Sequence, residues 1–238
     1  MATSRKGWKI ALFAGVWACL FALAFWGTVS RQEEEVLRLH RLLVSAQNRE
    51  VYSLEERLQV DGREEVSLSA VSQASPRLAR VASRVRLTES EDFRFEVYFS
   101  SDALYIYSRN SGVWNRAAYN HPAAAELEEL RDPFAFWLRM LAHASEVRAR
   151  GGGRFEVTLR PFRDDIHGMH VEDVLEARML ISLDEASGRL DTLTLHARLK
   201  PSIIKNRREI EYTARVTGNA GVPALTLPEA AQSAIPLP

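Results

Sequence analysis

The feature that most constrains this chain is an uncharged apolar run over Ile10–Gly27, which reads IALFAGVWACLFALAFWG. As an α-helix its residues would extend about 27 Å, close to the ~30 Å hydrocarbon core of a bilayer. The leader over residues 1–9 carries Arg5, Lys6 and Lys9 and no acidic residue. Because basic flanks stay in the cytoplasm, we expect a transmembrane helix over 10–27 and an extracytoplasmic remainder at the cell membrane.

Two other interpretations of this run stay open. A cleaved signal peptide has a shorter apolar region followed by a small-x-small site, and Gly27–Ser30 offers only a poor one. A lipoprotein signal would be lipidated at Cys19, but Trp17 is bulky where a small residue is expected. The chain also stays apolar beyond Cys19, so a retained single-pass anchor is the favoured prediction.

Composition excludes several classes of function for the part of the chain after this run. The whole chain has 31 basic and 31 acidic residues, and the three basic residues of the leader leave the remainder slightly acidic. Such a balance is not that of a nucleic-acid-binding domain. Cys19 is the only cysteine, so the outward part has no disulfide, thiolate metal site or cysteine nucleophile. The remaining length suits one ordinary domain.

Hydrophobic periodicity predicts first a helix and then a sheet. Over residues 28–50, Val36, Leu39, Leu43 and Ala46 recur on one helical face, so we expect an amphipathic juxtamembrane helix. Alternation with a period of two follows, with a hairpin signal at Asp61-Gly62. The alternating runs, each a predicted strand, lie over 52–60, 66–70, 77–88, 93–99, 104–107, 113–114, 155–159, 174–184, 190–199 and 210–216.

A helical block interrupts these strands. Pro122–Leu130 is rich in Ala and Glu, and Asp132-Pro133 is a strong helix start. The helix from Pro133 is apolar over most of its surface, and we expect it to include Val147 and to end at Gly151–Gly153. We therefore predict an α+β fold with one domain over 51–231 and a loose tail over 232–238.

Two phrases and the order of elements suggest a family. The phrases are Ala103–Tyr107 followed by Gly112-Val113-Trp114, and the hairpin over 181–190. With the Asp-Pro helical block between strands, the chain from Val36 to Ala231 resembles the bacterial LolA-like superfamily. That superfamily includes outer-membrane lipoprotein carriers, the mycobacterial LppX and LprG lipoproteins, and RseB-type sensors.

The resemblance implies a curved, incomplete antiparallel barrel that closes over a helical plug and holds acyl chains in its hollow. We accordingly expect binding of a lipid, a lipoprotein or another apolar ligand at the membrane. The alternative is a cell-envelope sensor or protein-interaction module with a filled core and an envelope protein partner. The candidate lining residues are Phe93, Phe95, Phe99, Phe134, Trp137, Leu138 and Leu141.

No motif predicts catalysis or a cofactor. The chain lacks a Gly-x-Ser-x-Gly elbow, a phosphate loop and a dinucleotide fingerprint. Asp164, Asp165, His167 and His170 could ligate a divalent metal, but their spacing matches no metalloprotease signature. A polar, solvated loop over Asp164–Asp173 is the favoured interpretation, and we expect a non-enzymatic protein.

Overall fold

A computed structural model of the chain describes residues 32–45, 52–73, 75–131, 133–184, 189–201, 207–217 and 224–237. The predicted transmembrane helix over Ile10–Gly27, with Cys19, lies outside the described residues. Within these ranges, no helix combines the length and apolar character needed to cross a bilayer.

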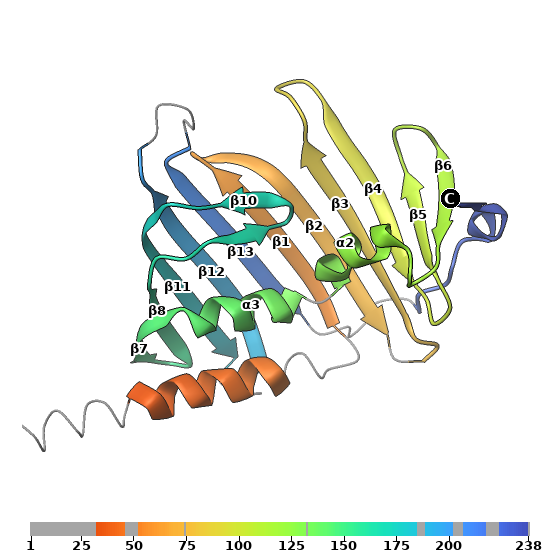
Figure 1. The fold of residues 1–238 in the computed structure, drawn as a ribbon. Coiled ribbons are helices and arrows are strands. Elements are labelled where there is room, and N and C mark those ends of the chain that lie inside the picture. Colours follow the sequence, from red (N-terminus) through yellow and green to blue (C-terminus); the bar gives the residue numbers. More distant parts are fainter. Residues whose placement is uncertain are drawn as a thin grey trace, which may run out of the picture.

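The centre of the fold is a curved sheet of twelve strands whose two ends do not meet (Figure 1). Its order is β14-β6-β5-β4-β3-β2-β1-β13-β12-β11-β8-β7, and neighbours are antiparallel except for β14 and β6. The predicted α+β class with a curved, open antiparallel sheet is confirmed. The strands of this sheet are β1 (Tyr52–Val60), β2 (Arg63–Gln73), β3 (Leu78–Arg86), β4 (Asp92–Phe99), β5 (Leu104–Ser108), β6 (Val113–Ala117), β7 (Ala144–Gly151), β8 (Arg154–Leu159), β11 (Val174–Asp184), β12 (Arg189–Leu199), β13 (Glu209–Thr217) and β14 (Ile235–Pro236).

The predicted turn at Asp61-Gly62 joins β1 to β2. Both residues have left-handed backbones, with φ of 51° and 76°, as a two-residue type I′ hairpin requires. The Asp61 carboxylate also accepts the backbone N–H groups of Arg208, at 2.9 Å, and Glu209, at 2.8 Å. The turn is therefore fixed to the start of β13, the other neighbour of β1.

Two helices cover one face of the sheet, which we call the concave face (Figure 1). They are α2 (Pro122–Arg131) and α3 (Pro133–Ala142), and α3 begins at the proline that the sequence indicated. The predicted extent of α3 was wrong: it ends at Ala142, and Val147 lies in β7 opposite Val157 of β8. Gly151–Gly153 all have left-handed backbones and turn the chain back, so that β7 pairs with β8 and Val147 is buried in the core.

The N-terminal helix (residues 32–45) confirms the described part of the predicted amphipathic helix. Leu39 and Leu43 are buried in the core, whereas Leu37 is exposed. Gln32 donates a hydrogen bond to the backbone carbonyl of Ser145, and the Arg38 guanidinium lies 5.2 Å from the ring centre of Phe155. The helix is thereby placed against β7 and β8.

The expected polar loop over Asp164–Asp173 is instead largely a hairpin of two strands, β9 (Asp164–Ile166) and β10 (Met169–Val171). It forms its own two-stranded sheet in front of the concave face (Figure 1). Ile166 and Val171 are each 1% exposed. The loop prediction failed because the hairpin has only three apolar residues, these two and the half-buried Met169, and polar side chains surround them in the sequence.

The expected loose tail is held against the sheet. A short 3₁₀ helix, η1 (Glu229–Ser233), buries Ala231, and β14 then pairs in parallel with the edge strand β6. The chain before η1 is held at Leu225, because the Gln73 side-chain amide donates to the Leu225 carbonyl and accepts from the Leu225 N–H. The segment from Leu225 to Leu237 covers side chains on the opposite, convex face of the sheet and protects the edge of β6.

Candidate functional site

The concave face divides into two parts that differ in what covers them. The first, which we call the filled half, comprises β1, β13, β12, β11 and β8 with α3, the N-terminal helix and the β9–β10 hairpin over them. The second, which we call the open strip, consists of Val85, Phe93 and Phe95 near the ends of β3 and β4 that form their hairpin, with Ile106 in the middle of β5.

The filled half holds most of the predicted lining residues as ordinary core. Trp137 is 0% exposed and Phe134 2%, with ring centres 4.9 Å apart in an edge-to-face contact. Phe134 also meets Tyr52 edge to face at 5.6 Å. Leu141 is likewise buried and Leu138 half-buried. These side chains contact one another and stabilise the domain.

The open strip holds two other predicted lining residues, Phe93 and Phe95. Phe93 is 38% exposed, Phe95 is half-buried, and their ring centres lie 5.4 Å apart. Val85 pairs with Phe93 across the ladder, and the exposed Leu87 continues the same row beyond β3. Phe99, further along β4, is buried near α2. The strip therefore begins where the β3–β4 hairpin extends past α2 (Figure 1).

Side chains from β3 to β6 that alternate onto the concave face include no ionisable group. The strand registers place them together, and they are Ala79, Val81, Ser83, Val85, Phe93, Phe95, Val97, Phe99, Leu104, Ile106, Ser108, Val113, Asn115 and Ala117. The open strip is thus an apolar surface that offers a charged ligand no counter-charge.

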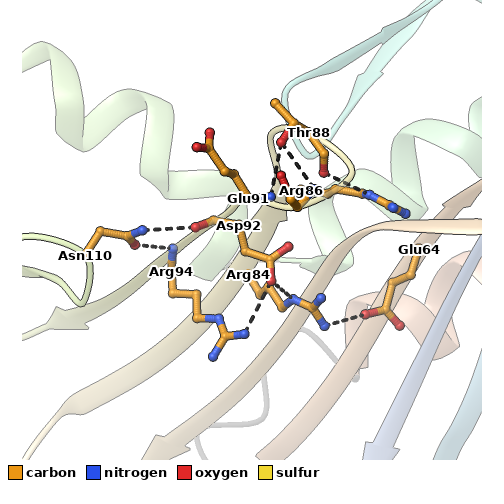
Figure 2. Close-up of polar contacts among 9 residues, drawn as sticks. Glu64, Arg84, Arg86, Thr88, Glu91, Asp92, Arg94 and Asn110 are labelled. Carbon is orange, nitrogen blue, oxygen red and sulfur yellow. Dashed lines mark hydrogen bonds and ion pairs between the residues drawn. The ribbon is translucent and has the colours of Figure 1, made fainter.

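The opposite, convex face of the same hairpin is strongly charged. Arg84 donates to Asp92 at 2.8 Å and lies 3.7 Å from Glu64, and Arg94 reaches Asp92 at 3.3 Å (Figure 2). The hydrogen bond from Arg84 holds the pKa of Asp92 below its usual value. Asn110, in the turn between β5 and β6, joins this turn to β4: its side chain accepts from the Arg94 N–H and donates to the Asp92 carbonyl.

The hairpin tip is held in the same way. Thr88 Oγ1 accepts the backbone N–H groups of Ser90, at 3.3 Å, and Glu91, at 3.1 Å, and its carbonyl accepts from Arg86 (Figure 2). These contacts order the tip while Leu87 and Phe93 stay exposed. The hairpin therefore presents an apolar row on one side and a polar, cross-linked surface on the other.

A buried carboxylate lies where the two parts of the concave face meet. Glu56 sits in the middle of β1, the seventh strand in the sheet order, and is 2% exposed. Its Oε1 accepts a hydrogen bond from the Tyr212 hydroxyl at 2.6 Å, and that hydroxyl accepts from Trp137 Nε1 at 3.0 Å. Burial raises the pKa of Tyr212 well above its usual value, and the charge of Glu56 adds to this effect.

The β9–β10 hairpin brings His167 to the same carboxylate. His167 and Gly168 form its turn with left-handed φ values of 48° and 78°. His167 Nε2 lies 2.7 Å from the second oxygen of Glu56, with the ring tilted away from a linear hydrogen bond. The His167 side chain is only 9% exposed, and its ring centre is 5.6 Å from that of Tyr212.

The remaining predicted metal ligands lie elsewhere on the hairpin. His170 is exposed and pairs with Asp165 at 2.9 Å, and Asp164 lies 3.4 Å from Arg139 of α3. His167, in the turn of the hairpin, contacts Glu56 instead. Across the described ranges, no three His, Cys, Asp or Glu residues are placed to hold a metal ion.

Hydrophobic periodicity alone did not identify Glu56 and Tyr212 as site residues. The signal for Glu56 is present in the sequence, because it falls in phase with Tyr52, Leu54, Leu58 and Val60, where every other side chain is apolar. A carboxylate at an inward position of a central strand needs a buried partner. Which partner it has depends on pairing between β1 and β13, about 150 residues apart in the chain.

Comparison with protein-family models and with curated proteins finds no match to this chain.

Proposed function

We propose that this protein is a non-enzymatic, membrane-anchored domain of the bacterial cell envelope that binds the acyl chain of a lipid on its concave face. The observation that carries the proposal is the open strip, a partly exposed apolar row in which Phe93 is 38% exposed and Val85, Phe95 and Ile106 are half-buried. The predicted anchor over Ile10–Gly27 would fix this surface close to its ligand.

Surface chemistry favours an acyl chain over other ligands. Each methylene removed from water contributes about 0.8 kcal/mol, so contact along Val85, Phe93 and Phe95 would suffice for useful affinity. An acyl chain needs no hydrogen-bonding or charged partner, and the inward side chains of β3 to β6 supply no charge. A peptide ligand would leave its polar backbone groups against apolar side chains.

The curved open sheet with helices on its concave face is consistent with the LolA-like resemblance. In that family the hollow between sheet and helices holds acyl chains. A protein that keeps its anchor cannot shuttle between membranes, so we propose that it holds, senses or hands over lipid locally.

Two matched variants test this function. Phe93→Asp places a charge in the open strip, and Leu180→Asp places one on the convex face at a residue of similar exposure, 45% against 38%. Native mass spectrometry of the full chain, extracted in maltoside detergent, should show a lipid adduct for the wild type and Leu180→Asp. Phe93→Asp should lose it, and adducts on all three proteins would place the ligand elsewhere.

The filled half favours a second candidate, an interaction or sensor module that acts through its surface. Its aromatic rings already contact each other, as Phe134 and Trp137 do. If the wild type retains no lipid and takes up none from vesicles, this second function replaces the first.

A further inference from the structure

The β9–β10 hairpin is attached to the domain differently from every strand of the main sheet. Its ladder joins β9 only to β10, with Ile166 opposite Met169. Within the described residues, no ladder pairs β9 or β10 with a strand of the main sheet. Segments with few backbone ties to their surroundings open at a lower free energy than the central strands of a sheet.

Both ends of the hairpin are tied down. Before it, the Arg160 N–H donates to the His143 carbonyl at 2.8 Å, and Phe162 stacks on the His143 ring at 5.6 Å. After it, the Lys200 N–H donates to the Asp173 carbonyl at 2.8 Å. The hairpin can therefore rotate about two fixed ends without unfolding the sheet.

At its far end the hairpin meets the sheet in the polar contact between His167 and Glu56. Glu56 is the one carboxylate among the inward-facing side chains of β1 to β6. Buried pairs of this kind add little net stability compared with apolar side chains, but losing one partner is costly. They suit an element that must be held in one defined position.

Apart from Glu56 and the Tyr212 hydroxyl that donates to it, the side chains beneath the hairpin are apolar. Tyr212 and Trp137 are both 0% exposed, and Ile166 and Val171 fill the space above the sheet. Lifting the hairpin would remove Ile166 and Val171 from this space. The apolar surface, interrupted by Glu56 on β1, would then extend from the open strip into the filled half.

We propose that the β9–β10 hairpin is a lid that lengthens the lipid-binding surface when it opens, and that the contact between His167 and Glu56 is its latch. The role assigned to the opened surface rests on the proposed function. The lid and latch themselves do not, because they are properties of the protein without ligand.

Amide hydrogen exchange of the full chain in nanodiscs of phosphatidylcholine and phosphatidylglycerol tests the latch. Glu56→Gln keeps an acceptor for Tyr212 but removes the charge. His167→Asn keeps a residue that tolerates the left-handed turn and leaves the bonds among Glu56, Tyr212 and Trp137 in place. Asp165→Asn, which weakens only the exposed pair with His170 on the same hairpin, is the control.

We expect the amides of residues 164–171 to exchange about tenfold faster in either latch variant, with β12 unchanged. The double variant should be no faster than the single ones, since both break the same contact. Equal acceleration in Asp165→Asn, additive effects, or acceleration spread through β1 and β13 would overturn the latch.

Vesicles containing a phosphatidylcholine with a photoreactive acyl chain test the consequence. In the latch variants, crosslinks should extend from β4 to the α3 peptide that contains Trp137. If the hairpin of these variants exchanges faster but crosslinks stay confined to β4, the hairpin opens without lengthening the surface that binds the acyl chain. If β4 of the wild type is not labelled, the proposed function is wrong. The latch is then still tested separately by the exchange experiment.

Discussion

The filled half and the open strip are built from the same alternating pattern on one sheet, and they differ only in what lies above them. Trp137 and Phe93 were equal candidates for lining a hollow, yet one is 0% and the other 38% exposed. Alternation assigns a side chain to a face. The lid hairpin, α3 and the N-terminal helix decide whether that face is core or binding surface.

The largest difference between the two parts should appear on truncation of Trp137. We expect Trp137→Ala to lower the free energy of unfolding by about 3–5 kcal/mol, because it leaves a cavity and removes the donor to Tyr212. Urea denaturation monitored by circular dichroism measures this. A loss below about 1 kcal/mol would mean that the filled half is loosely packed.

A smaller loss is expected at the boundary between the two parts. Tyr212→Phe keeps the ring but leaves Glu56 without its donor and Trp137 without its acceptor. Unsatisfied buried groups cost about 1–3 kcal/mol, so the free energy of unfolding should fall by that amount. A variant as stable as the wild type would show that water replaces the hydroxyl and that the boundary is wet.

The convex face behind the open strip should be sensitive to acid. Burial of Glu96 raises its pKa, but hydrogen bonds from Arg109 and Arg80 outweigh this and leave the pKa below its usual 4.5. A lowered pKa in the folded state contributes stability above the unfolded pKa and loses it as the pH falls through the folded value. Glu96→Gln should therefore reduce stability at neutral pH and flatten its decline below about pH 4.5. Parallel curves for the two proteins in denaturant titrations from pH 7 downward would contradict this role of Glu96.

The smallest effect on stability belongs to the open strip. Phe93→Ala should change the free energy of unfolding by no more than about 1 kcal/mol, since its ring is partly exposed and packs mainly on Phe95. The same denaturation experiment serves as the measurement. A loss as large as that of Trp137→Ala would show that the strip is core and would end the distinction between the two parts.

Local sequence patterns predicted much of the fold. The alternating runs predicted β1, β11 and β12 nearly to the residue, and with the Asp-Gly turn they predicted the middle of β2, because each depends on its own side-chain pattern. Prediction failed where pairing with another strand decided the outcome. Val147 continues a helical pattern but lies in β7, where β8 supplies its partner.

The site was only partly predictable, for the same reason. Apolar periodicity identified Phe93 and Phe95, but their exposure depends on where α2 ends above the sheet. His167 was singled out as a possible metal ligand, whereas its contact is Glu56, from a strand more than 100 residues earlier. A short sequence window contains neither the lid above the sheet nor the carboxylate below it.

Photocrosslinking in a bilayer tests the central claim most directly. The full chain would be placed in phosphatidylethanolamine–phosphatidylglycerol vesicles with a photoreactive acyl lipid, irradiated, and mapped by peptide mass spectrometry. The account predicts label on the β4 peptide with Phe93 and Phe95, lost in Phe93→Asp and retained in Leu180→Asp. Label restricted to the predicted anchor over Ile10–Gly27, with none on β4, would contradict it.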